Sequence, residues 1–157
     1  MKITEGNHLI APILNQFISE KGSWTLSDGV LSQTSDETNT KRLLKGFSSN
    51  NYTLEFKARK IAGAEGFIIY FGIDNEGRKG FAFNLGGWNN KTTAVQEVAR
   101  GNTGSMIGEG IKHSIESGKW YDIKVIISPE KAELFLDGKF LIDYTHTIQP
   151  LHYLSSG

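Results

Sequence analysis

The chain has 157 residues, the length of one domain, and it is long enough to bury a core without disulfides or metal ions. Its 17 Lys and Arg residues balance its 17 Asp and Glu residues, which argues against partners held by net charge, namely nucleic acids and anionic membranes. It has no Cys, so disulfide scaffolds, cysteine zinc sites and thiol chemistry are excluded.

Glycine and aromatic residues are the informative part of the composition. The 18 Gly, 9 Phe, 5 Tyr and 3 Trp residues are typical of short strands joined by turns. Because no signal-peptide core follows Met1 and the chain stops on small residues after an apolar segment, we expect residues 1–157 to be one domain excised from a larger protein. The compartment, extracellular or cytoplasmic, stays open.

The N-terminal third contains one hairpin signal and one long polar run. Asn15–Glu20 has the spacing of a single helical turn. Asp28-Gly29 lies between the short alternating runs Trp24–Ser27 and Val30–Leu31, which predicts a hairpin because both turn residues need a positive φ. The polar run Ser32–Lys41 is expected to be a loop between strands.

Three strands are predicted in the middle of the chain from alternation of apolar and polar residues. Tyr52–Lys60 has one buried and one solvated face, whereas Gly66–Ile73 is apolar on both faces and is expected to be a central strand of a sandwich. A turn at Asp74–Gly77 leads to the strand Gly80–Leu85, in which Asn84 points away from the buried face.

The clearest pattern is a three-strand meander near the C-terminus. Trp120–Ser128, Ala132–Leu136 and Lys139–Tyr144 alternate, and Asp137-Gly138 makes the second turn. Some ten or more short strands with almost no helical periodicity predict an all-β fold, a two-sheet antiparallel jelly-roll β-sandwich.

Two motifs carry a resemblance to known families. The strand start Gly118-Lys-Trp120 with the Asp137-Gly138 turn resembles the concanavalin A-like (laminin G-like) jelly rolls. Residues 63–72 (GAEGFIIYFG) and 83–90 (FNLGGWNN) are similar to the jelly-roll module found in bacterial family 51 α-L-arabinofuranosidases, and this likeness spans about residues 24–144. Asn89 stands where that family usually has Gly, and Thr93 lies near an expected His.

The resemblance implies a non-catalytic carbohydrate-binding or accessory module of a hemicellulose-degrading glycoside hydrolase. Its ligand would be a neutral plant polysaccharide containing arabinose or xylose. Its other partner would be the catalytic domain of the parent chain, an α-L-arabinofuranosidase. Two alternatives stay open: a purely structural jelly roll that packs on that catalytic domain, and a glycosidase in its own right.

Catalytic and cofactor motifs are missing from the sequence. There is no E-x-D-x-x-E run of the kind that pairs carboxylates on β-glucanase strands, and the four His residues show no metal-ligand spacing. No catalytic residue and no cofactor are therefore predicted. The family's jelly rolls sometimes hold a structural calcium ion, for which Asp74, with Asn75 and Glu76, is a weak candidate; a polar hairpin tip is the alternative.

The candidate sugar-binding residues cluster around Gly86-Gly87. Proteins bind sugars with an aromatic ring against the C–H face and with amides that replace the hydration of the hydroxyl groups. The candidates are Trp88, Asn84, Asn89, Asn90, Tyr70 and Gln96, with Arg100 as a weaker one. Tyr70 and Asn84 share a sheet face if their strands are neighbours.

Each candidate also has an alternative interpretation. Trp88 and Asn84 could belong to the core, and Gln96 and Arg100 could be ordinary surface residues. Trp24 and Trp120, at the starts of strands, are expected to pack. An exposed Trp88 would favour sugar binding, and an apolar patch near Ile126, Phe135 and Leu141 with a buried Trp88 would favour the structural jelly roll.

Overall fold

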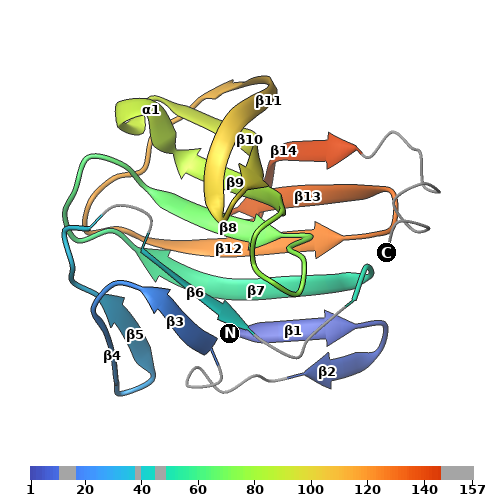
Figure 1. Ribbon diagram of the computed structural model, residues 1–157, viewed down its shortest axis with the longest axis horizontal. Coiled ribbons are helices and arrows are strands. Elements are labelled where there is room, and N and C mark those ends of the chain that lie inside the picture. Colours follow the sequence, from blue (N-terminus) through green and yellow to red (C-terminus); the bar gives the residue numbers. More distant parts are fainter. Residues whose placement is uncertain (11–16, 38–39, 45–48, 146–157) are drawn as a thin grey trace.

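The computed structural model describes residues 1–10, 17–37, 40–44 and 49–145, and these form two main antiparallel sheets packed face to face (Figure 1). The six-stranded sheet has the order β14-β13-β12-β7-β1-β2 and the four-stranded sheet the order β11-β10-β9-β8. Two small two-stranded pairs, β3-β6 and β4-β5, lie to one side (Figure 1).

The strand bounds follow the alternating segments of the sequence. The six-stranded sheet consists of β1 (Lys2–Glu5), β2 (His8–Ile10), β7 (Tyr52–Arg59), β12 (Trp120–Ile127), β13 (Lys131–Leu136) and β14 (Lys139–Thr145). The four-stranded sheet consists of β8 (Phe67–Phe71), β9 (Gly80–Gly86), β10 (Thr92–Ala99) and β11 (Asn102–Lys112). The remaining elements are β3 (Phe17–Lys21), β4 (Trp24–Ser27), β5 (Val30–Gln33), β6 (Lys41–Leu44) and the one-turn helix α1 (Gly87–Asn90).

The core lies between the two main sheets and is filled by alternate residues of their inner faces. Phe83 and Leu85 on β9 face Ile123 and Leu134 of the opposite sheet in one buried cluster. Aromatic rings extend this cluster, because Phe71 stacks on Phe83 with ring centres 4.7 Å apart. The sequence prediction of a two-sheet antiparallel sandwich is confirmed.

The predicted hairpins also form. Asp28 and Gly29 both have positive φ between β4 and β5, and Asp137 and Gly138 do the same between β13 and β14. The meander β12-β13-β14 is contiguous in the sheet, as its alternation indicated.

Two element predictions are wrong. The strand predicted over Gly66–Ile73 is not central: β8 is the last strand of its sheet, and its second apolar face carries Ile68, which is 38% exposed. The helical turn predicted over Asn15–Glu20 is contradicted at Phe17–Glu20, which pair with β6 as a strand, so sheet hydrogen bonds outweigh the local helical spacing. Residues 15 and 16 lie outside the described residues.

No helix in the described part of the chain is long and apolar enough to cross a membrane.

Candidate functional site

A left-handed turn follows β9 and carries the exposed tryptophan of the predicted site. Trp88 (φ 51°, ψ 57°), Asn89 (φ 61°, ψ 41°) and Asn90 (φ 62°) all have left-handed backbone conformations. This conformation costs an L-residue about 1–2 kcal/mol, less for Asn, and it is rare in consecutive residues. Such strain persists only where the surrounding structure fixes it, and it is frequent at functional sites.

Hydrogen bonds to a distant segment fix the turn. Asn90 donates from Nδ2 to the Ile115 carbonyl oxygen (2.9 Å), and the Ile115 amide donates to Asn90 Oδ1 (2.7 Å). Within the turn, the Lys91 amide donates to the Gly87 carbonyl oxygen (2.9 Å). Both polar atoms of the Asn90 side chain are therefore engaged in holding the turn.

The base of the turn is held from both sides. The Gly86 amide donates to Thr93 Oγ1 (3.0 Å), and this hydroxyl lies 2.8 Å from His113 Nδ1. On the other side, the Asn89 amide donates to Glu65 Oε1 (3.1 Å). The Thr93 side chain, near the position where the family resemblance led us to expect His, thus has a partner on each side.

Gly86 and Gly87 have no room for a side chain, because neighbouring atoms lie too close to where a Cβ would be. A Cβ on Gly86, whose φ is +68°, would lie 2.5 Å from Asn90 Oδ1. A Cβ on Gly87 would lie 2.6 Å from Asn84 Nδ2. The absence of both side chains therefore lets the turn fold directly onto Asn84.

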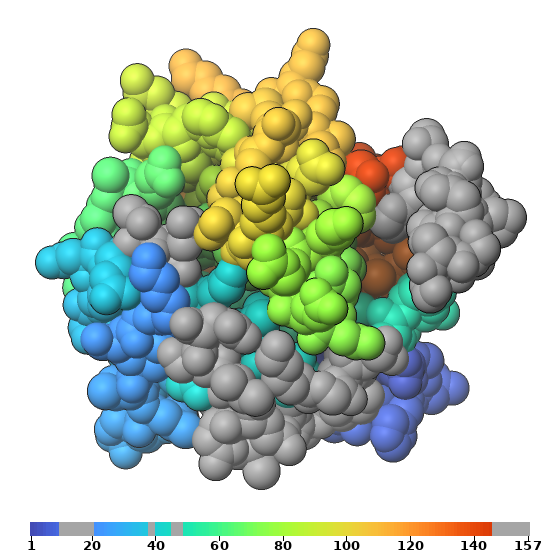
Figure 2. Space-filling model, in the orientation of Figure 1, coloured from blue at the N-terminus to red at the C-terminus, as the bar shows by residue number. Residues whose placement is uncertain are grey.

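Trp88 is a surface residue. Its side chain is 38% exposed, and the segment that carries it lies at the upper left edge of the molecule (Figures 1 and 2). The alternative that Trp88 fills the core is wrong, because Phe83 and Leu85 of the preceding strand already occupy the core face. The fixed turn thus presents a large aromatic ring to solvent.

Behind the turn, a chain of amides crosses the outer face of the four-stranded sheet, the face opposite the core. Asn84 Nδ2 donates to Gln96 Oε1 (2.8 Å), and Gln96 Nε2 donates to the Gly104 carbonyl oxygen (2.8 Å). Asn84 and Gln96 are 7% and 8% exposed. Gln96 thereby orients Asn84, whose Oδ1 atom has no hydrogen-bond partner among the described residues.

Tyr70 lies on the same outer face. Strand β8 pairs with β9 so that Tyr70 is opposite Ala82 and Ile68 is opposite Asn84, which confirms that Tyr70 and Asn84 share a sheet face. The Lys41 ammonium group lies 5.6 Å from the centre of the Tyr70 ring and donates to the Gly101 carbonyl oxygen. Burial raises the pKa of Tyr70, so its hydroxyl stays protonated at neutral pH.

The remaining candidates have other surroundings. Arg100 is exposed in the β10–β11 turn with a positive φ of 55°, which agrees with the surface alternative. Trp24 is half-buried and donates from its indole to the Lys21 carbonyl oxygen (2.8 Å). Trp120 does not pack as expected: it is 46% exposed on the outer face of the six-stranded sheet, because its position in β12 alternates with the buried Tyr121.

The candidate calcium turn is held by its own backbone. Asp74 Oδ1 accepts a hydrogen bond from the Arg78 amide (2.8 Å), and this and other backbone amides lower the pKa of the Asp74 carboxyl. Among the described residues, no group of three or more His, Asp or Glu side chains is arranged to hold a metal ion. The calcium ion stays a prediction.

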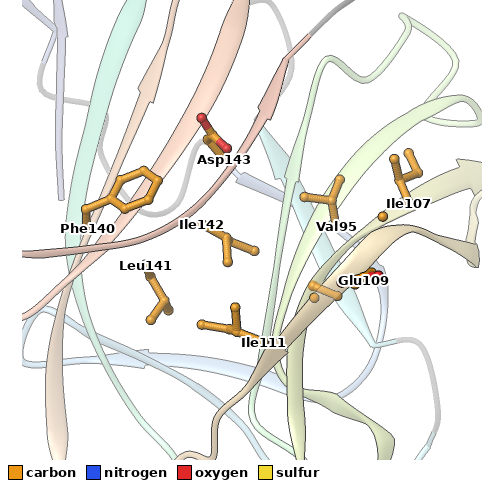
Figure 3. Close-up of a pocket in the computed structure, with 11 residues that line it drawn as sticks. Val95, Ile107, Glu109, Ile111, Phe140, Leu141, Ile142 and Asp143 are labelled. Carbon is orange, nitrogen blue, oxygen red and sulfur yellow. The ribbon is translucent and has the colours of Figure 1, made fainter.

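A separate apolar cleft lies where the edges of the two sheets meet. It has a volume of about 300 Å³ between β10-β11 and β14, and Figure 3 shows Ile111, Leu141 and Ile142 directed toward it. Glu109 and Asp143 also line the cleft, on opposite sides. Phe140 stands at the β14 side and is 53% exposed.

The fold has a close counterpart among solved structures. The carbohydrate-binding module CBM66 from Bacillus subtilis superposes with a TM-score of 0.68 at 19% sequence identity, covering 85% of this chain and 81% of that one. The chain is a jelly-roll β-sandwich. At this level of identity, the similarity concerns the fold alone.

One curated protein is related in sequence. Over 119 residues, the chain is 37% identical to an extracellular exo-α-L-arabinofuranosidase from Streptomyces chartreusis, and the matched part is 75% of this chain. It corresponds to only 14% of that enzyme. The chain is thus homologous to one region of an arabinofuranosidase, as the motifs at residues 63–72 and 83–90 indicated. No known family model matches the chain.

Proposed function

We propose that the chain is a non-catalytic carbohydrate-binding module of a hemicellulose-degrading glycoside hydrolase. The observation that carries this proposal is the exposed ring of Trp88 on a strained turn, whose preceding residue, Gly87, packs against the oriented amide of Asn84. An aromatic face and a fixed amide are what a sugar ring requires, since its C–H face is apolar and its hydroxyl groups need hydrogen bonds.

The residues have different roles in this proposal. Trp88 stacks on the sugar, and Asn84 Oδ1 and the Asn89 side chain bind its hydroxyl groups. Asn90 and Gln96 act as positioning residues, because their amides are engaged by Ile115 and by Asn84 and Gly104. Tyr70, with Lys41 above its ring, extends the polar surface along the outer face of the sheet.

One relative supports the proposed ligand and setting. A region shared with an extracellular arabinofuranosidase supports a neutral polysaccharide that contains arabinose or xylose as the ligand, and an extracellular setting. The net charge of zero agrees with a neutral glycan. Because the matched region is 14% of the relative, the catalytic work belongs to other parts of such an enzyme.

A calorimetric titration across arabinoxylan, arabinan and xylo-oligosaccharides tests this function. We expect saturable heat with at least one of them, and a Trp88→Ala variant should bind the polymer that gives heat about tenfold more weakly, a loss of about 1.4 kcal/mol. The control is Phe140→Ala, which removes an exposed aromatic ring on β14, a strand of the other sheet, and should leave the affinity unchanged. No heat from any polysaccharide in the panel would contradict the proposal.

The apolar cleft supports the second candidate, a module that packs on its catalytic domain. Ile107, Ile111 and Leu141 offer apolar contacts, and the carboxylates of Glu109 and Asp143 would meet Lys or Arg side chains of that domain. In the longer enzyme, Leu141→Glu should free the module from the catalytic domain, seen as increased protease cleavage between them. Unchanged cleavage would contradict this second function.

A further inference from the structure

The outer face of the six-stranded sheet carries an exposed tryptophan that the site around Trp88 does not use. Trp120 begins β12 and pairs in register with Arg59 on β7. The guanidinium carbon of Arg59 lies 4.7 Å from the centre of the indole ring, a cation–π contact that holds the ring in place. With 46% of its side chain exposed, Trp120 presents more of its surface than Trp88 does.

Two unused hydrogen-bonding groups and one exposed ion pair lie on this face of the sheet. Within the described part of the chain, neither the Arg59 guanidinium nor the Trp120 indole N–H has a hydrogen-bond or ion-pair partner. The next cross-strand pair, Lys57 and Asp122, forms an exposed ion pair with an N–O distance of 3.6 Å. Donors and an acceptor thus lie beside an aromatic face, as they do around Trp88.

The two tryptophans lie at the same end of the sandwich but on different sheets. The loop after β7 and the segment before β12 meet there, since the Gly118 amide donates to the Lys60 carbonyl oxygen (2.7 Å). The same loop reaches the left-handed turn through Glu65 and the Asn89 amide. In Figure 1, α1 and the start of β12 both lie at the left of the molecule.

We propose that Trp120, with Arg59, Lys57 and Asp122, forms a second sugar-binding surface for the same polysaccharide; this rests on the proposed function. A glycan is the occupant that fits, because the surface pairs one exposed aromatic ring with the unpaired Arg59 guanidinium and indole N–H donors, which suit the C–H face and the hydroxyl groups of a sugar. An apolar protein partner would find more apolar surface at the cleft near Phe140.

Two surfaces on one module change how it binds a polymer. Once one surface holds a polysaccharide chain, the other meets a neighbouring stretch or a second chain at high effective concentration. Short oligosaccharides occupy the two surfaces separately. The module therefore binds polymers more tightly than fragments.

Single and double variants test the second surface. In titrations with short arabinoxylan oligosaccharides, we expect two molecules bound per wild-type chain, one per Trp120→Ala or Trp88→Ala chain, and none for the double variant. On arabinoxylan affinity gels, Trp120→Ala should bind about tenfold more weakly than wild type, and Trp120→Tyr, which keeps an aromatic ring, should recover most of the loss. Phe140→Ala is the matched control, an exposed aromatic residue on the same sheet.

The outcomes separate this inference from the function on which it rests. If Trp120→Ala binds oligosaccharide and polymer like the wild type while Trp88→Ala loses all binding, the second surface is wrong and the proposed function stands. If the wild-type chain binds no glycan at all, both fall. A thermal melt of each variant matching the wild type excludes loss of the fold as the cause.

Discussion

Three asparagines of similar chemistry have different roles around the left-handed turn. Asn90 uses both amide atoms on the Ile115 backbone, Asn84 is oriented by Gln96, and Asn89 leaves its side chain exposed. The sequence predicted that amides gather beside Trp88. It did not distinguish the proposed sugar-binding amides from the positioning ones, because that difference depends on partners 12 and 25 residues away along the chain.

Glycine substitutions at Asn89 and Asn90 test this division. Asn90→Gly keeps the left-handed backbone but removes the two hydrogen bonds to Ile115, so the free energy of unfolding should fall by about 1–3 kcal/mol. Asn89→Gly is the matched control and should change it by about 0.5 kcal/mol or less. Equal effects in urea denaturation would contradict the assigned role of Asn90.

The pH dependence of stability has a contribution from His113. Burial lowers the pKa of His113 below its usual value of 6.5, so the unfolded chain binds a proton at this residue before the folded chain does. The contribution of neutral His113 to the free energy of unfolding is therefore fully present above pH 6.5, and it is lost as the pH falls through the pKa of His113 in the folded chain. Urea denaturation between pH 8 and pH 5 should show a shallower fall in stability for His113→Gln. A fall as steep as that of the wild type would contradict this.

At the scale of strands, local patterns predicted well and neighbour order did not. The meander β12-β13-β14 was predictable because alternation and the Asp137-Gly138 turn lie within one short segment. The edge position of β8 was not predictable, because a strand with two apolar faces is equally expected at the centre of a sheet. The one-turn helix α1 was not predicted either, since its conformation depends on contacts with Ile115.

The pairing of β10 with β11 can be tested with two glycines that both have positive φ. A Cβ on Gly110 would lie 2.8 Å from Ala94 Cβ and 2.9 Å from the Thr93 carbonyl oxygen, whereas a Cβ on Gly108 meets nothing within 4 Å. Gly108→Ala should therefore cost only about 1 kcal/mol of backbone strain. Gly110→Ala should lower the free energy of unfolding by the same backbone strain plus about 1–3 kcal/mol for overpacking against Ala94 and Thr93. Similar melting temperatures for the two variants would contradict the packing of β11 on β10.

At the scale of the whole molecule, the sandwich separates three surfaces. The turn with Trp88 and the outer face with Trp120 are polar surfaces with exposed rings, and the cleft between the sheet edges combines apolar side chains with two carboxylates. Such a separation lets a module hold polysaccharide on one part of its surface while it packs on another domain through a different part. The excess of Gly and aromatic residues in the composition is explained by the turns, the core and these exposed rings.

Contact between Trp88 and sugar can be measured by the fluorescence of a chain in which Trp88 is the single tryptophan. Trp24→Phe with Trp120→Phe leaves this one indole, whose partial exposure makes its emission sensitive to a ligand on the ring. Titration with the oligosaccharide that gives calorimetric heat should shift or quench the emission and saturate at the concentration found by calorimetry. Emission that stays constant while heat is released would show that sugar binds elsewhere, and would contradict a contact between Trp88 and sugar.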